Sequence, residues 1–148
     1  MANIFSQSKK LCLTSLNLGS NKFKHRGAAA LLQTLSNNTR VPIAKLILNN
    51  NYLESNKKPS HDSTFYCFTK ALVSFLSNSK TLNHLSMGCC NLGRETALAI
   101  GEGLLKNTRL QTLNVRGNLI QLNGIREIVR ACYENNKLVL KHLDFSSN

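Results

Sequence analysis

One short pattern of apolar residues recurs five times along this chain, and it constrains the fold more than any other feature. Each copy follows the spacing L-x-x-L-x-L-x-x-N, with another apolar residue replacing some leucines and a cysteine once replacing the asparagine. The copies occupy residues 13–21, 43–51, 82–90, 110–118 and 140–148. Five copies in one register indicate a chain built from repeated units, each too small to bury its own apolar face.

Two periodicities alternate within every unit. In the L-x-L part, successive side chains point to opposite faces of a strand, so both leucines face the same side. Between the copies, apolar residues recur three or four positions apart, as on one face of a helix, in residues 28–35, 68–76, 97–105 and 125–132. The copies begin 30, 39, 28 and 30 residues apart. This spacing leaves room for a helix that returns the chain to the start of the next parallel strand.

The repeated pattern resembles the leucine-rich repeat signature, L-x-x-L-x-L-x-x-N/C-x-L. The resemblance covers about residues 8–148, and the unit length with full helices makes the chain similar to the ribonuclease-inhibitor-like class. It implies an α/β solenoid of about five units, with a curved parallel sheet on the concave side and helices on the convex side. It also implies that the asparagine amides bond neighbouring turns. Cys90 stands once in the asparagine position, where we expect a small buried thiol.

The chain departs from the pattern in its second unit and at both ends. The second unit is about ten residues too long, and the excess, at about residues 55–64, is polar and contains Pro59. Such an insertion emerges as a surface loop, often beside the binding face, although loop entropy also tolerates an insertion without a role. No capping unit is recognisable. We expect one leucine-rich repeat domain, residues 1–148, belonging to a longer array or an assembly in which neighbouring repeats or subunits cover its ends.

The charge balance excludes ribonuclease inhibition, one activity of the class that the chain resembles. Lys and Arg number 19 against 7 Asp and Glu, a formal net charge of +12. Ribonuclease inhibitors capture basic enzymes on an acidic surface, so a chain this basic would repel them.

There is no apolar run of the ~18 residues that a membrane span needs, no secretory leader and no C-x-x-C pair among five cysteines. We therefore expect reduced thiols, no membrane contact and a cytoplasmic location, with a nuclear one left open.

Candidate partner contacts follow from the outward strand positions and the insertion. The outward positions are mostly small and polar, whereas most of the positive charge falls on turns and helices. On the concave face the candidate contacts are Lys45, Ile47, His84, Asn114, Arg116, Lys141 and Asp144. On the inserted loop they are Lys57, Lys58 and His61. A separate basic edge is expected where each helix turns into the next strand, formed by Arg40, Lys80, Arg109 and Lys137.

Catalytic chemistry has little support in this sequence. His84 and His142 occupy the same repeat position two units apart, roughly 10 Å from each other across the strands, too far to share a metal. We expect no catalytic residues, no metal and no cofactor. The preferred interpretation is a non-catalytic protein–protein interaction scaffold with an acidic protein partner, in a regulatory, cytoskeletal or ciliary assembly. The alternative is a nucleic-acid-contacting element of a ribonucleoprotein, bound through phosphates at the basic edge.

Overall fold

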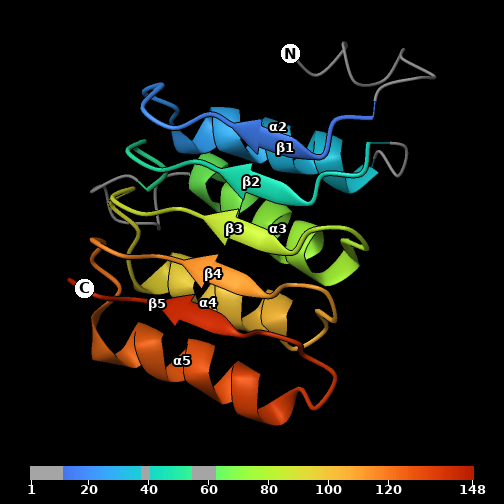
Figure 1. Cartoon of the computed structure of the whole chain (residues 1–148). Coiled ribbons are helices and arrows are strands. Elements are labelled where there is room, and N and C mark those ends of the chain that lie inside the picture. The colour runs from blue at the N-terminus through green and yellow to red at the C-terminus, as the bar shows by residue number, and fades with distance from the viewer. Residues whose placement is uncertain (1–11, 38–40, 55–62) are drawn as a thin grey trace.

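The computed structural model describes residues 12–37, 41–54 and 63–148, and strands alternate with helices along them. The elements are β1 (Ser15–Asn17), α2 (His25–Asn37), β2 (Lys45–Ile47), α3 (Ser63–Asn78), β3 (His84–Ser86), α4 (Arg94–Leu104), β4 (Thr112–Asn114), α5 (Gln121–Glu134) and β5 (His142–Asp144). The strands form one layer and the helices a second layer behind it (Figure 1). The predicted α/β layout of strand, turn and helix is thus confirmed.

The five described strands form one parallel sheet in which spatial order equals chain order. The middle residue of each strand is the second leucine of the repeat pattern, and register pairs these residues across the whole sheet. The row consists of Leu16, Leu46, Leu85, Leu113 and Leu143. Each leucine points toward the helices, so its two neighbours in the strand point to the opposite face.

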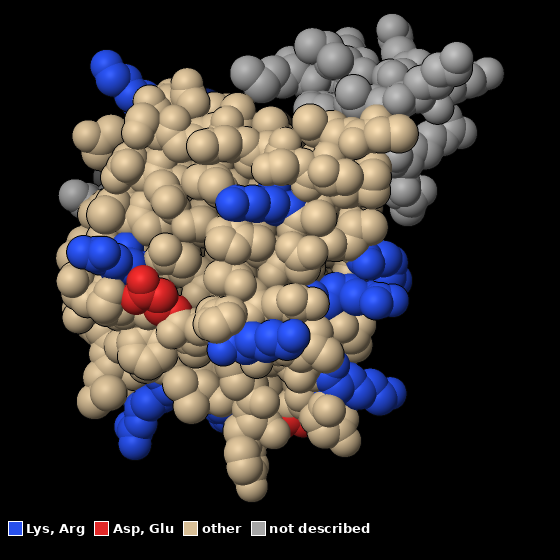
Figure 2. Space-filling model, in the orientation of Figure 1, with Lys and Arg blue, Asp and Glu red and all other residues tan. Residues whose placement is uncertain are grey.

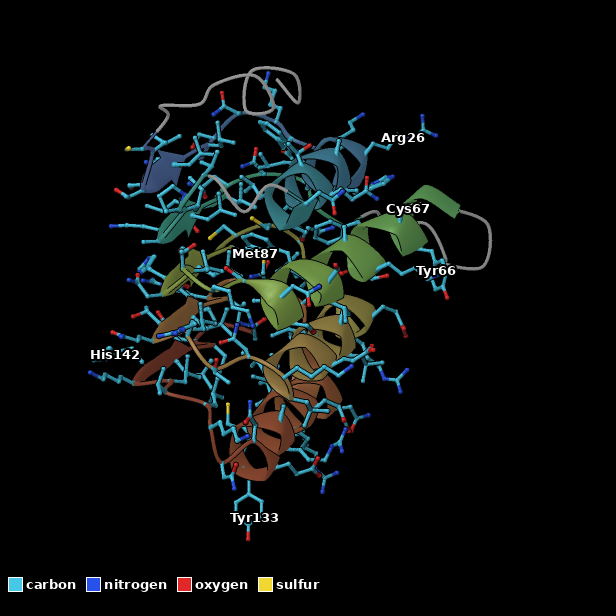
Figure 3. All side chains as sticks on the ribbon, turned by 90° about the vertical axis from the view of Figure 1, so that its right-hand side faces the viewer. Arg26, Tyr66, Cys67, Met87, Tyr133 and His142 are labelled. Carbon is cyan, nitrogen blue, oxygen red and sulfur yellow. The ribbon has the colours of Figure 1, made fainter. Side chains whose placement is uncertain are left out.

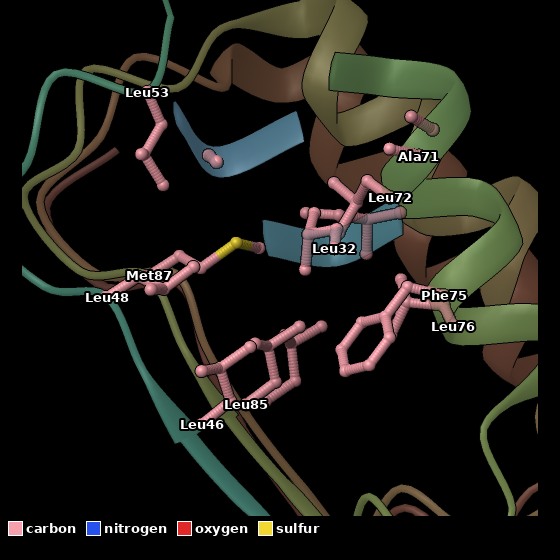
Figure 4. Close-up of a cluster of buried hydrophobic side chains, with 14 of the residues drawn as sticks. Leu32, Leu46, Leu48, Leu53, Ala71, Leu72, Phe75, Leu76, Leu85 and Met87 are labelled. Carbon is pink, nitrogen blue, oxygen red and sulfur yellow. The ribbon is translucent and has the colours of Figure 1, made fainter. Parts of the chain in front are cut away.

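The core lies between the sheet and the helix layer. Leu46, Leu85 and Leu113 are fully buried, whereas the corresponding leucines of β1 and β5 are only partly buried. Figure 4 shows Leu46 and Leu85 facing Phe75 and Leu76 of α3 across this core. Burial of these aliphatic and aromatic side chains is the main force that holds each helix against the sheet.

Asparagines tie each strand-exit turn to the preceding one, as the repeat pattern implies. Asn118 Oδ1 accepts hydrogen bonds from the backbone N–H groups of Cys90 and Leu92, at 2.9 and 3.0 Å. Its Nδ2 donates to the backbone oxygens of Met87 and Val115, at 2.9 and 2.6 Å. Asn51 and Asn148 make the same kinds of bond toward the units before them. Backbone groups buried in the turns therefore have partners.

Cys90 is the buried thiol that the sequence predicts at the asparagine position. Its Sγ donates to the backbone oxygens of Leu48 and Gly88, at 3.1 and 3.3 Å, and so replaces the donor half of an asparagine. Burial raises the pKa of this thiol to about 11, so it stays protonated at neutral pH.

The residue before the asparagine position of each repeat, which Cys90 occupies once, adopts a left-handed backbone conformation. These residues are Ser20, Asn50, Cys89, Gly117 and Ser147, with φ between 53° and 66°. This conformation bends the chain out of the strand, and only one unit uses glycine for it, the residue best suited to positive φ. A Cβ at position 117 would also lie 2.8 Å from Cys89 Sγ.

Glycines in the helix layer permit close approach between helices. A Cβ added to Gly103 of α4 would lie 2.6 Å from the Cβ of Leu76 in α3. A Cβ added to Gly124 of α5 would lie 2.7 Å from the Cβ of Ala97 in α4. These residues weaken helix propensity, and their role is to bring the helices together.

Two details differ from the sequence-based expectation. The excess polar segment was expected at about residues 55–64, and α3 begins at Ser63, so the last two of these residues belong to the helix. The candidate contacts Lys57, Lys58 and His61 lie outside the described residues. Val129, expected on the apolar face of α5, is 47% exposed. The buried residues of α5 are instead Gly124, Ile128 and Ala131.

Candidate functional site

The face of the sheet that points away from the helices is the candidate site, and we call it the outer sheet face. In Figure 3 the described helices lie on one side of the sheet, and His142 projects from the other. The face consists of two rows of side chains that flank the buried leucines. The first row is Ser15, Lys45, His84, Thr112 and His142, and the second is Asn17, Ile47, Ser86, Asn114 and Asp144.

The structure brings most of the predicted contacts together here. A shallow hollow crosses β3, β4 and β5, and four predicted contacts line it, namely His84, Asn114, Lys141 and Asp144. Lys45 pairs in register with His84, and the positive charge of Arg116 acts on Asp144. Ile47 lies further along β2, half-buried in the second row. Thr112 and His142 also line the hollow, although neither was among the candidate partner contacts.

Several polar side chains of this face form hydrogen bonds with nearby residues of the protein. Asn114 Oδ1 accepts from the Arg116 backbone N–H at 2.9 Å. Asp144 Oδ1 accepts from the backbone N–H and the hydroxyl of Ser146, at 3.0 and 2.7 Å. Ser86 is 3% exposed and donates its hydroxyl to Asn49 Oδ1 at 2.8 Å. These bonds fix the strand ends, so Asn114 and Asp144 have only part of their polar surface available to a partner.

The outer sheet face is basic. Lys45, Arg116 and Lys141 are exposed, and Asp144 is the one carboxylate at a described strand position. Figure 2, which views this face, shows more basic than acidic side chains on it and along its edges. The hydrogen bonds from Ser146, with Arg116 nearby, lower the pKa of Asp144. Burial and the nearby charge of Lys45 lower the pKa of His84, which favours its neutral form.

Three of the four residues predicted to form a basic edge lie among the described residues. Lys80, Arg109 and Lys137 are all exposed where helices turn into strands, and Arg40 lies outside the described residues. Asn107 Oδ1 and Asn135 Oδ1 accept from the backbone N–H groups of Arg109 and Lys137, at 2.9 and 3.0 Å. The same backbone hydrogen bond therefore forms in both turns, and both basic side chains are exposed to solvent.

The helix layer offers a contrasting surface. One groove runs between α3 and α4 and another between α4 and α5. Two arginines of the second groove are paired with carboxylates on the same helix: Arg130 contacts Glu127 and Glu134 at 2.8 and 3.1 Å, and Arg94 contacts Glu95 at 3.3 Å. Arg126 lines the second groove as well, and Lys70 and Lys106 line the first. The carboxylates thus offset part of the positive charge of the helix layer.

Glu54 is a structural carboxylate that sequence reasoning missed. Its Oε2 accepts from the Gly93 backbone N–H and from the Thr96 hydroxyl, and so caps the N-terminus of α4 from the preceding unit. Gly93 itself provides no side-chain cap. The partners lie 39 and 42 residues from Glu54, a separation that spans the insertion and carries no local sequence signal.

Titration of Glu54 gives a testable dependence of stability on pH. Burial raises the pKa of Glu54 above 4.5 in spite of its two hydrogen bonds. Because the folded-state pKa is the higher one, this group's contribution is fully present below the unfolded pKa and is lost as pH rises through the folded one. We expect the free energy of unfolding of the unchanged protein, relative to Glu54→Gln, to be greater near about pH 4 than near about pH 7.

Denaturant titrations of both proteins at the two pH values measure this difference. Glu102→Gln removes an exposed carboxylate from α4, the helix that Glu54 caps. This variant controls for the loss of one negative charge. A difference that stays constant with pH would mean that the hydrogen bonds from Gly93 and Thr96 offset the burial of Glu54.

The parallel strands, the inward leucines and the asparagine bonds define a solenoid of strand–turn–helix units. A family model described as Leucine Rich repeat matches residues 9–32 and 78–101. The chain therefore carries leucine-rich repeats. None of the curated proteins compared with it matches.

Leucine-rich repeats commonly mediate protein–protein interaction, and the family is generally a non-enzymatic interaction fold. Within residues 12–37, 41–54 and 63–148, no helix is long and apolar enough to cross a membrane. In the same part of the chain, no three histidine, cysteine, aspartate or glutamate side chains gather where they could hold a metal ion.

Proposed function

We propose that the chain is a non-catalytic scaffold that binds an acidic protein partner on the outer sheet face. The observation that carries this proposal is the charge of that face. Lys45, Arg116 and Lys141 are exposed on or beside the sheet, whereas Asp144, the carboxylate of the described strands, is engaged by Ser146. Complementary charge steers a partner to such a face and fixes its orientation.

The shape of the face supports a macromolecular partner rather than a small ligand. The described strands present two continuous rows of side chains, and a stable protein contact typically covers about 800 Å² on each partner. We place the scaffold in a cytoplasmic regulatory, cytoskeletal or ciliary assembly, by analogy of fold. A reducing compartment suits a chain with exposed free thiols at Cys12, Cys67 and Cys89.

Matched charge reversals test this proposal in a cell lysate. Lys45→Glu with Arg116→Glu alters the outer sheet face, and Arg94→Glu with Arg126→Glu alters the helix layer while changing net charge equally. We expect the first double variant to reduce recovery of the protein partner at least about tenfold, because like charges then face each other. The second should leave recovery within about twofold, since its residues lie away from the contact.

The proposal is wrong if the helix-layer variant alone loses the partner, or if neither variant does. Nuclease treatment tests the alternative, a nucleic-acid-contacting element of a ribonucleoprotein. Recovery that collapses with nuclease and falls steeply with salt would assign binding to phosphates and to the basic edge around Lys80, Arg109 and Lys137.

A further inference from the structure

The hollow in the outer sheet face has a definite floor and definite walls. Register places Thr112 of β4 directly between His84 of β3 and His142 of β5. Threonine is much smaller than histidine, so the row is low in its middle. Strands in a sheet are ~4.8 Å apart, so the backbones of the two histidines stand roughly 10 Å apart. A small group on a partner fits between two imidazoles at that separation.

The groups around this hollow favour a negative charge within it. His84 faces Lys45 of β2 on one side and Thr112 of β4 on the other. His142 pairs with Thr112 of β4, and Lys141 immediately precedes β5; both His142 and Lys141 line the hollow. The opposing charge is Asp144, which also lines the hollow and accepts two hydrogen bonds from Ser146. The lining thus holds one ammonium, one engaged carboxylate and two titratable imidazoles.

We propose that this hollow is the subsite for a carboxylate side chain of the acidic partner, which sits over Thr112 between His84 and His142, with Lys141 at the rim. This inference rests on the proposed function, since the same partner occupies the rest of the outer sheet face. The Thr112 hydroxyl and the imidazole N–H groups can donate hydrogen bonds to a carboxylate, and Lys141 supplies charge.

The subsite couples partner binding to proton uptake. Lys45 and burial lower the pKa of His84 in the free protein. A carboxylate placed beside an imidazole favours the protonated form and raises its pKa. The complex therefore binds more protons than the free protein, and affinity rises as pH falls through the range in which these histidines titrate.

The test uses the full chain and a fluorescein-labelled polyglutamate peptide, with a polyserine peptide as the neutral control. We expect the polyglutamate Kd to fall about 3- to 10-fold between about pH 7.5 and about pH 6, because glutamate stays ionised throughout this range while histidine gains a positive charge as pH falls. In NMR titrations the Cε1–H resonance of His84 should report a higher pKa with polyglutamate present than without it.

Two variants separate this subsite from the remainder of the face. His84→Gln with His142→Gln should remove the pH dependence but retain polyglutamate binding, because Lys45, Arg116 and Lys141 remain. His25→Gln, at the start of α2 in the helix layer, is the matched control and should keep the pH dependence.

The subsite is overturned if polyglutamate binding does not change with pH, or if the double histidine variant keeps the dependence of the unchanged chain. It is also overturned if polyglutamate does not bind while Lys45→Glu with Arg116→Glu still loses the cellular partner. In each of these results the proposed function survives. If that charge reversal loses no partner, the proposed function itself fails, and the subsite fails with it.

Discussion

Replacing Asn118 with alanine should lower the free energy of unfolding by about 3–5 kcal/mol. The Asn118 amide is 3% exposed and bonds two backbone N–H groups and two backbone oxygens in neighbouring turns at 3.0 Å or less. Alanine leaves these buried groups without their partner, and each unpaired group costs about 1–3 kcal/mol. Denaturant titration measures the loss, provided that unfolding remains two-state.

Two further variants sharpen this measurement. Asn118→Cys should lose less than Asn118→Ala, because Cys90 shows that a thiol in this position donates to two backbone oxygens. Asn136→Ala, at an exposed position between α5 and β5, should change stability by no more than about 0.5 kcal/mol. If Asn118→Ala cost no more than Asn136→Ala, the asparagine bonds between turns would not be what stabilises these turns.

Leu85→Ala should lower the free energy of unfolding by about 2–5 kcal/mol. Leu85 is fully buried at the centre of β3, with strands paired on both sides and the helix layer above it. Alanine removes the transfer energy of the lost methyl groups and leaves a cavity that close-packed neighbours fill only in part. The m-value should stay unchanged, since the surface exposed on unfolding is nearly the same.

The matched control is the same substitution at the same repeat position of β5. Leu143 is only partly buried, so Leu143→Ala removes less buried area and should cost less than half as much as Leu85→Ala. Equal losses at the two positions would contradict the burial pattern of the leucine row. They would indicate that the unit containing β5 is packed as tightly as the central one.

The repeat pattern predicted most of the fold because its signals are local and recur. Alternation identified Leu46 and Leu85 as inward residues, and both are fully buried. The same alternation predicted the outward position of His84, which lines the hollow with three other predicted contacts. Each of these predictions depends on neighbours within a few residues in the chain, where strand and helix geometry fix the direction of a side chain.

The predictions that failed or were missing depend on pairs far apart in sequence. Glu54 caps α4 through Gly93 and Thr96, and Gly103 packs against Leu76 of the neighbouring helix. Val129 was placed on the buried face of α5 because it is apolar, but the buried residues of that helix are Gly124, Ile128 and Ala131, and Gly124 approaches Ala97 of α4. Repeat spacing placed His84 and His142 two strands apart, but it did not indicate that the smaller Thr112 between them would leave a hollow.

The side chains at the asparagine position of the repeat bond in one direction along the chain, whereas Asn49 and Glu54 bond to the unit that follows them. Asn51, Cys90, Asn118 and Asn148 each bond backbone groups of the unit that precedes them, and Asn107 and Asn135 do the same at the opposite edge. During synthesis the earlier unit leaves the ribosome first, with these backbone groups still bonded to water. We therefore expect each newly emerging unit to supply the partners that these turns of the preceding unit lack until then.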